Sequence, residues 1–155
     1  MKLFNPLVLT SLLLGSLASA HDYTRGDLHI EHPWSRELPE VAPSLAAYFT
    51  LENLGSSDDQ LLGASSPIAG RVELHEHVHV EGRMKMQAVS QVAVPASGRV
   101  EFRPMTYHVM LFDLKQHPKS DEVFPLTLHF ARAGDVAIEV TVQKEAPSRS
   151  QNHAH

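Results

Sequence analysis

The chain has 155 residues, with 18 acidic and 13 basic side chains and a formal charge of -5 when histidine is neutral. A mildly acidic chain without basic clusters argues against nucleic acids and anionic membrane surfaces as partners. It contains 11 histidines and no cysteine, so the fold must be held by its core rather than by disulfides.

The first twenty residues have the pattern of a secretory signal peptide. Lys2 provides the charged start, an apolar run is centred on residues 7–17, and Ala18-Ser19-Ala20 provides a small-residue cleavage site. The apolar run is short and is interrupted by Ser and Gly, which argues against a membrane anchor. We therefore predict export with cleavage after Ala20 and a mature chain that begins at His21.

The rest of the chain predicts one all-β domain over residues 21–145 and a flexible, His-containing tail over residues 146–155. Residues 21–27 are expected to be a loose leader, Pro33 indicates an edge strand or a bulge, and no helical periodicity of useful length is present. Short alternating segments separated by turn residues are typical of an antiparallel sandwich or a small barrel. The predicted strands are 28–34, 46–53, 60–64, 72–80, 84–89, 92–94, 99–103, 107–114, 124–130 and 136–142.

Two of these strand pairs are predicted to be hairpins. Residues 92–94 and 99–103 would pair around 96–98, and residues 72–80 and 84–89 around Glu81-Gly82. Glycine at the second turn position suits a type I′ turn, which makes the residue numbers of paired positions sum to 163. Met86 then lies opposite His77 and is the diagonal neighbour of His75 on the same face.

Histidines and methionines recur at every second position in this part of the chain. Alternate residues of a strand share a face, so one face is expected to carry His75 and another His108 with Met110. Two neutral imidazoles and two neutral, soft thioethers favour Cu(I) over zinc, calcium or magnesium. We expect Met86 and His108 to lie on a surface face. Spacing alone leaves open that each methionine fills the core and each histidine is solvated.

Further metal donors are left open. His77 and His79 share the face of His75 and are either solvated strand residues, extra ligands or a path by which copper enters. A second site for Cu(II) at the chain termini is a hypothesis, since an α-amino group and imidazoles suit that ion. It would use His21, His153 and His155.

No enzyme motif accompanies these donors. The sequence has no nucleophile elbow, no H-E-x-x-H and no phosphate-binding glycine loop, and in the run His75-Glu76-His77 the carboxylate points away from both rings if the segment is a strand. We therefore predict a protein that is not an enzyme.

The chain resembles the PCuAC-type copper chaperones. The motif of that family is a His, ten residues, a Met, twenty-one residues and then His-x-Met. This chain matches it at His75, Met86, His108 and Met110, and the resemblance extends over about residues 28–142. One departure is Pro104-Met105-Thr106, where relatives often have Pro-Gly-Gly, and whether Met105 is a spare ligand is open.

The resemblance implies a cupredoxin-like antiparallel β-sandwich of the Greek-key type. It implies that His75, Met86, His108 and Met110 bind one Cu(I) in the periplasm. It also implies delivery toward the CuA centre of cytochrome c oxidase, with subunit II of that enzyme or a thioredoxin-like copper chaperone as partner. The alternative is a copper-sequestering resistance protein without a delivery role.

Overall fold

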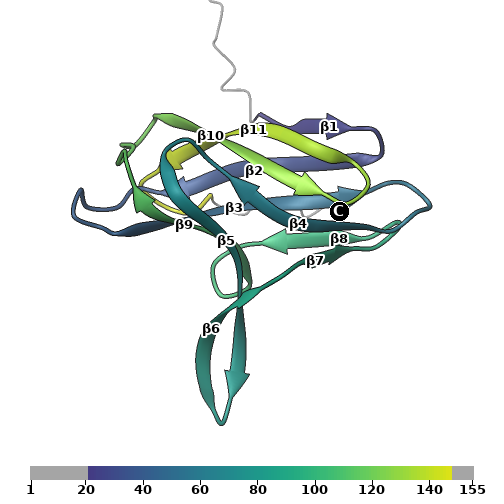
Figure 1. The fold of residues 1–155 in the computed structure, drawn as a ribbon, viewed down its shortest axis with the longest axis horizontal. Helices are drawn as coiled ribbons and strands as arrows, with labels where there is room; N and C mark the ends of the chain where they lie inside the picture. Colours follow the sequence, from purple (N-terminus) through teal and green to yellow (C-terminus); the bar gives the residue numbers. More distant parts are fainter. Residues whose placement is uncertain (1–20, 148–155) are drawn as a thin grey trace, which may run out of the picture.

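The structure is a computed structural model that describes residues 21–147, and within this range the chain is an all-β sandwich without helices (Figure 1). No helix in the described part is therefore long and apolar enough to cross a membrane. The predicted signal peptide and most of the predicted tail lie outside the described residues. The strands are β1 (Tyr23–Arg25), β2 (Leu28–Arg36), β3 (Ser44–Asn53), β4 (Asp59–Ser65), β5 (Ala69–Val80), β6 (Arg83–Val89), β7 (Val92–Val94), β8 (Arg99–Phe102), β9 (Tyr107–Leu114), β10 (Val123–Phe130) and β11 (Gly134–Gln143).

The strands follow the order β6-β5-β9-β8-β3-β2-β11-β10-β4-β7, with β1 added beside β2 and a further pairing of β9 with β3. Most pairs are antiparallel, and β11–β2 and β8–β9 are parallel. The predicted fold class, a cupredoxin-like sandwich, is confirmed by this architecture.

Strict alternation in β3 shows how the sequence builds the core. Leu45, Ala47, Phe49 and Leu51 are buried, and each is flanked by less buried neighbours. The rings of Phe49 and Phe102 stack with centroids 4.6 Å apart. Burying one such side chain contributes about 1.5–3 kcal/mol, so the inner face of β3 fixes which side chains remain on its outer face.

The β5–β6 hairpin has the predicted register. Val80 pairs with Arg83, and His77 pairs with Met86. Glu81 and Gly82 have φ of 51° and 73°, the two positive values that a type I′ turn requires. The hairpin projects from the body of the sandwich (Figure 1), because the pairing of β5 with β9 ends at Glu76.

Two expectations about the strands are wrong. Residues 21–27 are not only a loose leader, because Tyr23–Arg25 forms β1 against β2. Residues 92–94 and 99–102 are strands, yet they do not form a hairpin with each other: β7 pairs with β4, and β8 pairs with β3 and β9. The loop between β7 and β8 instead contacts the turn after β3, where the Ser97 backbone N–H donates a hydrogen bond to the Gly55 carbonyl.

A bulge in β2 confirms the expectation at Pro33. The register of β2 against β3 shifts between Glu31 and Trp34, and the backbone N–H of His32 donates to the Asp22 carboxylate at 3.1 Å. Beyond the bulge Trp34 pairs with Tyr48, and their rings lie 4.8 Å apart. The bulge therefore positions an aromatic pair beside the segment that carries the predicted site.

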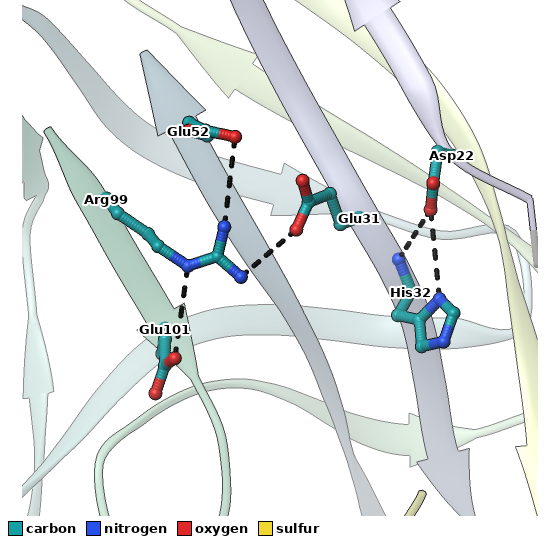
Figure 2. A network of polar contacts seen from close by, with 6 residues as sticks. All are labelled: Asp22, Glu31, His32, Glu52, Arg99 and Glu101. Atoms are coloured by element: carbon teal, nitrogen blue, oxygen red, sulfur yellow. Dashed lines mark hydrogen bonds and ion pairs between the residues drawn. The ribbon is translucent and has the colours of Figure 1, made fainter. Parts of the chain in front are cut away.

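An ionic network crosses the outer face of β2, β3 and β8 near the bulge (Figure 2). The Arg99 guanidinium lies 3.1 Å from Glu31, 3.8 Å from Glu52 and 3.9 Å from Glu101. All four side chains are partly exposed, so each pair contributes about 1 kcal/mol or less. The network mainly balances three carboxylates that would otherwise repel one another.

Candidate metal centre

Neighbouring strands bring the predicted donors to one face of the sheet. β5 lies between β6 and β9. His75 pairs directly with His108 on β9, and Met110 pairs with Glu73, two residues along the same face of β5. Met86 on β6 pairs with His77 and is therefore diagonal to His75. All four predicted ligands share this face, and the two flanking methionines are both diagonal neighbours of His75.

Three imidazoles gather at the centre of this face. The ring centroids of His75 and His108 are 5.5 Å apart, and those of His77 and His108 are 5.3 Å apart. Phe112 closes the other side of His75 at 5.7 Å. This aromatic packing restricts the orientations that the three imidazole rings can take.

Glu73 sets the tautomer of His75. The His75 Nε2 atom lies 2.8 Å from the Glu73 carboxylate. An ionised carboxylate only accepts hydrogen bonds, so Nε2 carries the proton and donates. In the neutral ring the lone pair is then on Nδ1, which is buried and has no hydrogen-bond partner among residues 21–147. A buried acceptor without a partner is costly, and a metal ion would satisfy it.

Glu73 is itself held as a carboxylate. The hydrogen bond from His75 is the largest cause that lowers the pKa of Glu73, and the Arg71 guanidinium lowers it further. Arg71 also lies over the Phe112 ring, 4.1 Å from its centroid. Arg71, Glu73 and His75 thus form a chain of contacts along one face of β5.

His108 is buried, which contradicts the expectation that it lies on a surface face. It is only 3 % exposed, because it packs between His75 on β5 and Tyr48 on β3, whose ring is 6.4 Å away. Burial lowers the pKa of His108 to about 4; a hydrogen bond to the backbone of Thr106 opposes this, and His75 and His77 lower the pKa further. His108 is therefore neutral at neutral and mildly acidic pH.

The two methionines differ in exposure. Met86 is 43 % exposed, as expected for a residue on the projecting hairpin, and Met110 is half-buried. Within residues 21–147, no group of three or more His, Asp or Glu side chains is arranged to hold a metal ion. The predicted set does not depend on such a group, because two of its four donors are thioethers. The roles of all four side chains as metal ligands stay a prediction.

Of the other candidate donors, only His77 lies beside the predicted set. His77 donates from Nδ1 to the Thr106 carbonyl at 3.4 Å, and His79 pairs with Met84 farther out on the hairpin. Met105 is 58 % exposed in the turn between β8 and β9, with φ of 72°. His21 is exposed at the start of the described range. His153 and His155 lie outside it, so the second copper site stays a prediction.

Sequence reasoning missed two groups. Glu73 could have been found, because it is two residues before His75 and therefore on the same strand face. The second group is a hydrogen-bonded chain on β4, β10 and β11, strands that carry none of the predicted donors: the Ser65 hydroxyl lies 3.1 Å from His129 Nε2, and His129 Nδ1 lies 2.7 Å from Asp135. It sits on an exposed sheet surface. Hydrolysis by a Ser-His-Asp triad also needs hydrogen-bond donors for the oxyanion and a site shielded from water. The exposed position of this group does not provide that shielding.

Comparison with known proteins defines the class. The copper-bound PCuAC domain from PmoF2 superimposes with a TM-score of 0.69 at 27% identity, over 81% of this chain and 99% of that one. CuI-DR1885 from Deinococcus radiodurans gives a TM-score of 0.61 at 29% identity, over 73% of this chain and 76% of that one. The fold is that of a PCuAC domain, which confirms the resemblance inferred from the motif.

The family follows from the sequence match. The chain belongs to the LpqE-like family, whose model matches residues 28–142. The protein RP573 of Rickettsia prowazekii is 29% identical over 124 residues, which cover 77% of this chain and 68% of that protein.

Proposed function

We propose that this protein is an exported copper carrier that binds one Cu(I) through His75, Met86, His108 and Met110. The observation that carries the proposal is the His75–His108 pair: one ring presents a buried Nδ1 that has no hydrogen-bond partner within residues 21–147, and the other ring is kept neutral. The similarity to a copper-bound PCuAC domain and to CuI-DR1885 supports the same metal.

The arrangement favours a monovalent ion. The neutral His108 ring presents a lone pair without first losing a proton, and the two thioethers carry no proton to lose. Neutral donors leave the charge of the bound ion near +1, which suits Cu(I) better than a divalent ion that wants thiolate or carboxylate ligands. Glu73 stands behind His75 and partly compensates that charge.

Transfer would proceed by ligand exchange. Met86 is the most exposed of the four donors, with 43 % of its surface in solvent, and β6 is an end strand of the sheet. An incoming ligand from an acceptor can replace this thioether first, while buried His108 retains the ion. Release therefore begins at Met86 and ends at His108.

The metal assignment is tested by competition with a Cu(I) chelator, with zinc titrated in parallel. One equivalent of Cu(I) should bind tightly, and Met86→Leu and Met110→Leu should each weaken binding while the fold, measured by circular dichroism, is unchanged. The matched control is Met105→Leu, an exposed methionine outside the predicted set. Equal Cu(I) affinity in all three variants and the wild type would refute the ligand set.

We further propose that the chain works in the periplasm after cleavage at Ala20, and that it delivers copper toward the CuA centre of cytochrome c oxidase. Subunit II of the oxidase or a thioredoxin-like copper chaperone would receive the ion. Deletion should lower oxidase activity at low copper. If deletion instead only sensitises cells to high copper, the protein sequesters copper and the delivery role is rejected.

A further inference from the structure

The projecting end of the β5–β6 hairpin carries a second set of soft donors. His79 on β5 pairs directly with Met84 on β6, next to the His77–Met86 pair. Directly opposed residues have Cβ atoms about 4.5–5.5 Å apart, so the imidazole and the thioether of each pair can reach a common ion. Each pair offers one nitrogen and one sulfur.

The two faces of this ribbon differ in chemistry. The opposite face carries Glu76, which accepts a hydrogen bond from Gln87 at 2.8 Å, and the pair Val78–Lys85. All four soft donors are on one face and the charged side chains are on the other. Met84 is 39 % exposed and His79 is exposed, so neither is packed in the core.

We propose that His79 and Met84 form a second, weaker site for a soft monovalent ion at the end of the hairpin. This inference rests on the proposed function, and it makes the hairpin the place where Cu(I) enters and leaves. Two neutral donors suffice for a low-coordinate Cu(I) or Ag(I) ion, and a site with only two donors exchanges its ion more readily than one with four.

The donors form a continuous series from solvent to the buried rings. Alternate residues along a strand are about 6.8 Å apart, so the ion would pass from the His79–Met84 pair to the His77–Met86 pair and then to His75. Met86 belongs to both the hairpin and the main site. At each step a new donor can bind before the previous one leaves.

The test uses the mature chain with ¹³C-labelled methionine methyl groups, titrated with Ag(I) as a probe that is not oxidised. We expect two successive events in the wild type: the first shifts the methyl signals of Met86 and Met110, and the second shifts that of Met84. The double variant His79→Ala/Met84→Leu should lose the second event. The control Val78→Ala/Lys85→Ala changes the cross-strand pair on the other face and should retain both events.

The outcomes separate the two proposals. If the Met84 signal does not respond in the wild type, or if the control loses the second event as the double variant does, the hairpin site is refuted. If Met84 responds but the first event is absent, the hairpin site stands and the four-ligand centre is refuted.

Discussion

Replacing Glu73 by glutamine tests the role of this carboxylate in preparing His75. The side chain keeps its shape and loses its charge. The hydrogen bond to His75 Nε2, 2.8 Å long in the wild type, becomes a neutral one, about half as strong as a charge-assisted bond. The glutamine amide can also donate to Nε2, which would move the ring proton to Nδ1 and remove the lone pair offered to the metal.

The expected loss follows from comparable metal sites. Partners that orient a metal-binding histidine typically contribute about 10–100-fold to affinity, which corresponds to roughly 1.4–2.7 kcal/mol. We expect Glu73→Gln to weaken Cu(I) binding by about tenfold or more, because the Nδ1 atom that it prepares is buried. Competition with a Cu(I) chelator measures the affinity, and ¹⁵N shifts of His75 report the tautomer in the metal-free protein.

The matched control is Glu76→Gln. Glu76 is also close to His75 in the sequence, but it lies on the opposite face of the strand, where it accepts a hydrogen bond from Gln87. Its carboxylate therefore does not contact an imidazole. The control should bind Cu(I) as the wild type does. If the two variants have equal affinity, or if His75 keeps its tautomer in Glu73→Gln, Glu73 does not position the ring.

Three further outcomes follow from the structure. Because the pKa of His108 falls from 6.5 to about 4 on folding, the unfolded chain binds the proton first as the pH drops, and the metal-free protein should lose up to about 3 kcal/mol between these values. Urea unfolding should show a smaller loss in His108→Phe; equal losses would refute the link. Glu81→Asn should stabilise the type I′ turn by about 0.5–1 kcal/mol, seen as slower hydrogen exchange in β5 and β6 but not in β10. Phe49→Ala should cost about 3–5 kcal/mol in urea unfolding, and a cost below 1 kcal/mol would contradict its central place in the core.

The fold was predictable where the determinants are local. Alternation defines β3 and β9, and Gly82 fixes the register of the hairpin, so the position of Met86 relative to His77 follows from sequence alone. The pairing of β7 and β8 was not predictable from proximity, because their partners are strands far away in the sequence. Tyr23–Arg25 is too short to show a period, and only its contacts with β2 make it a strand.

The grouping of the candidate donors was predictable, but their environment was not. The spacing from His75 to Met110 predicts four soft ligands, and the strand registers place all four on one face of the sheet. The burial of His108 depends on Tyr48, which is 60 residues earlier and reaches it only through the pairing of β3 with β9. The pKa of His108, and therefore its readiness to bind a metal, is a property of the assembled sheet.

The position of β6 at the end of the sheet affects how readily the protein aggregates at high concentration. An exposed strand edge offers unpaired backbone groups to other chains and can start sheet-to-sheet aggregation. Arg83 and Lys85 project from β6 on the face opposite the methionines, and like charges on two approaching copies would repel each other. The same strand can therefore expose soft sulfur donors for exchange while its lysine and arginine discourage the intermolecular β-pairing that its edge would otherwise invite.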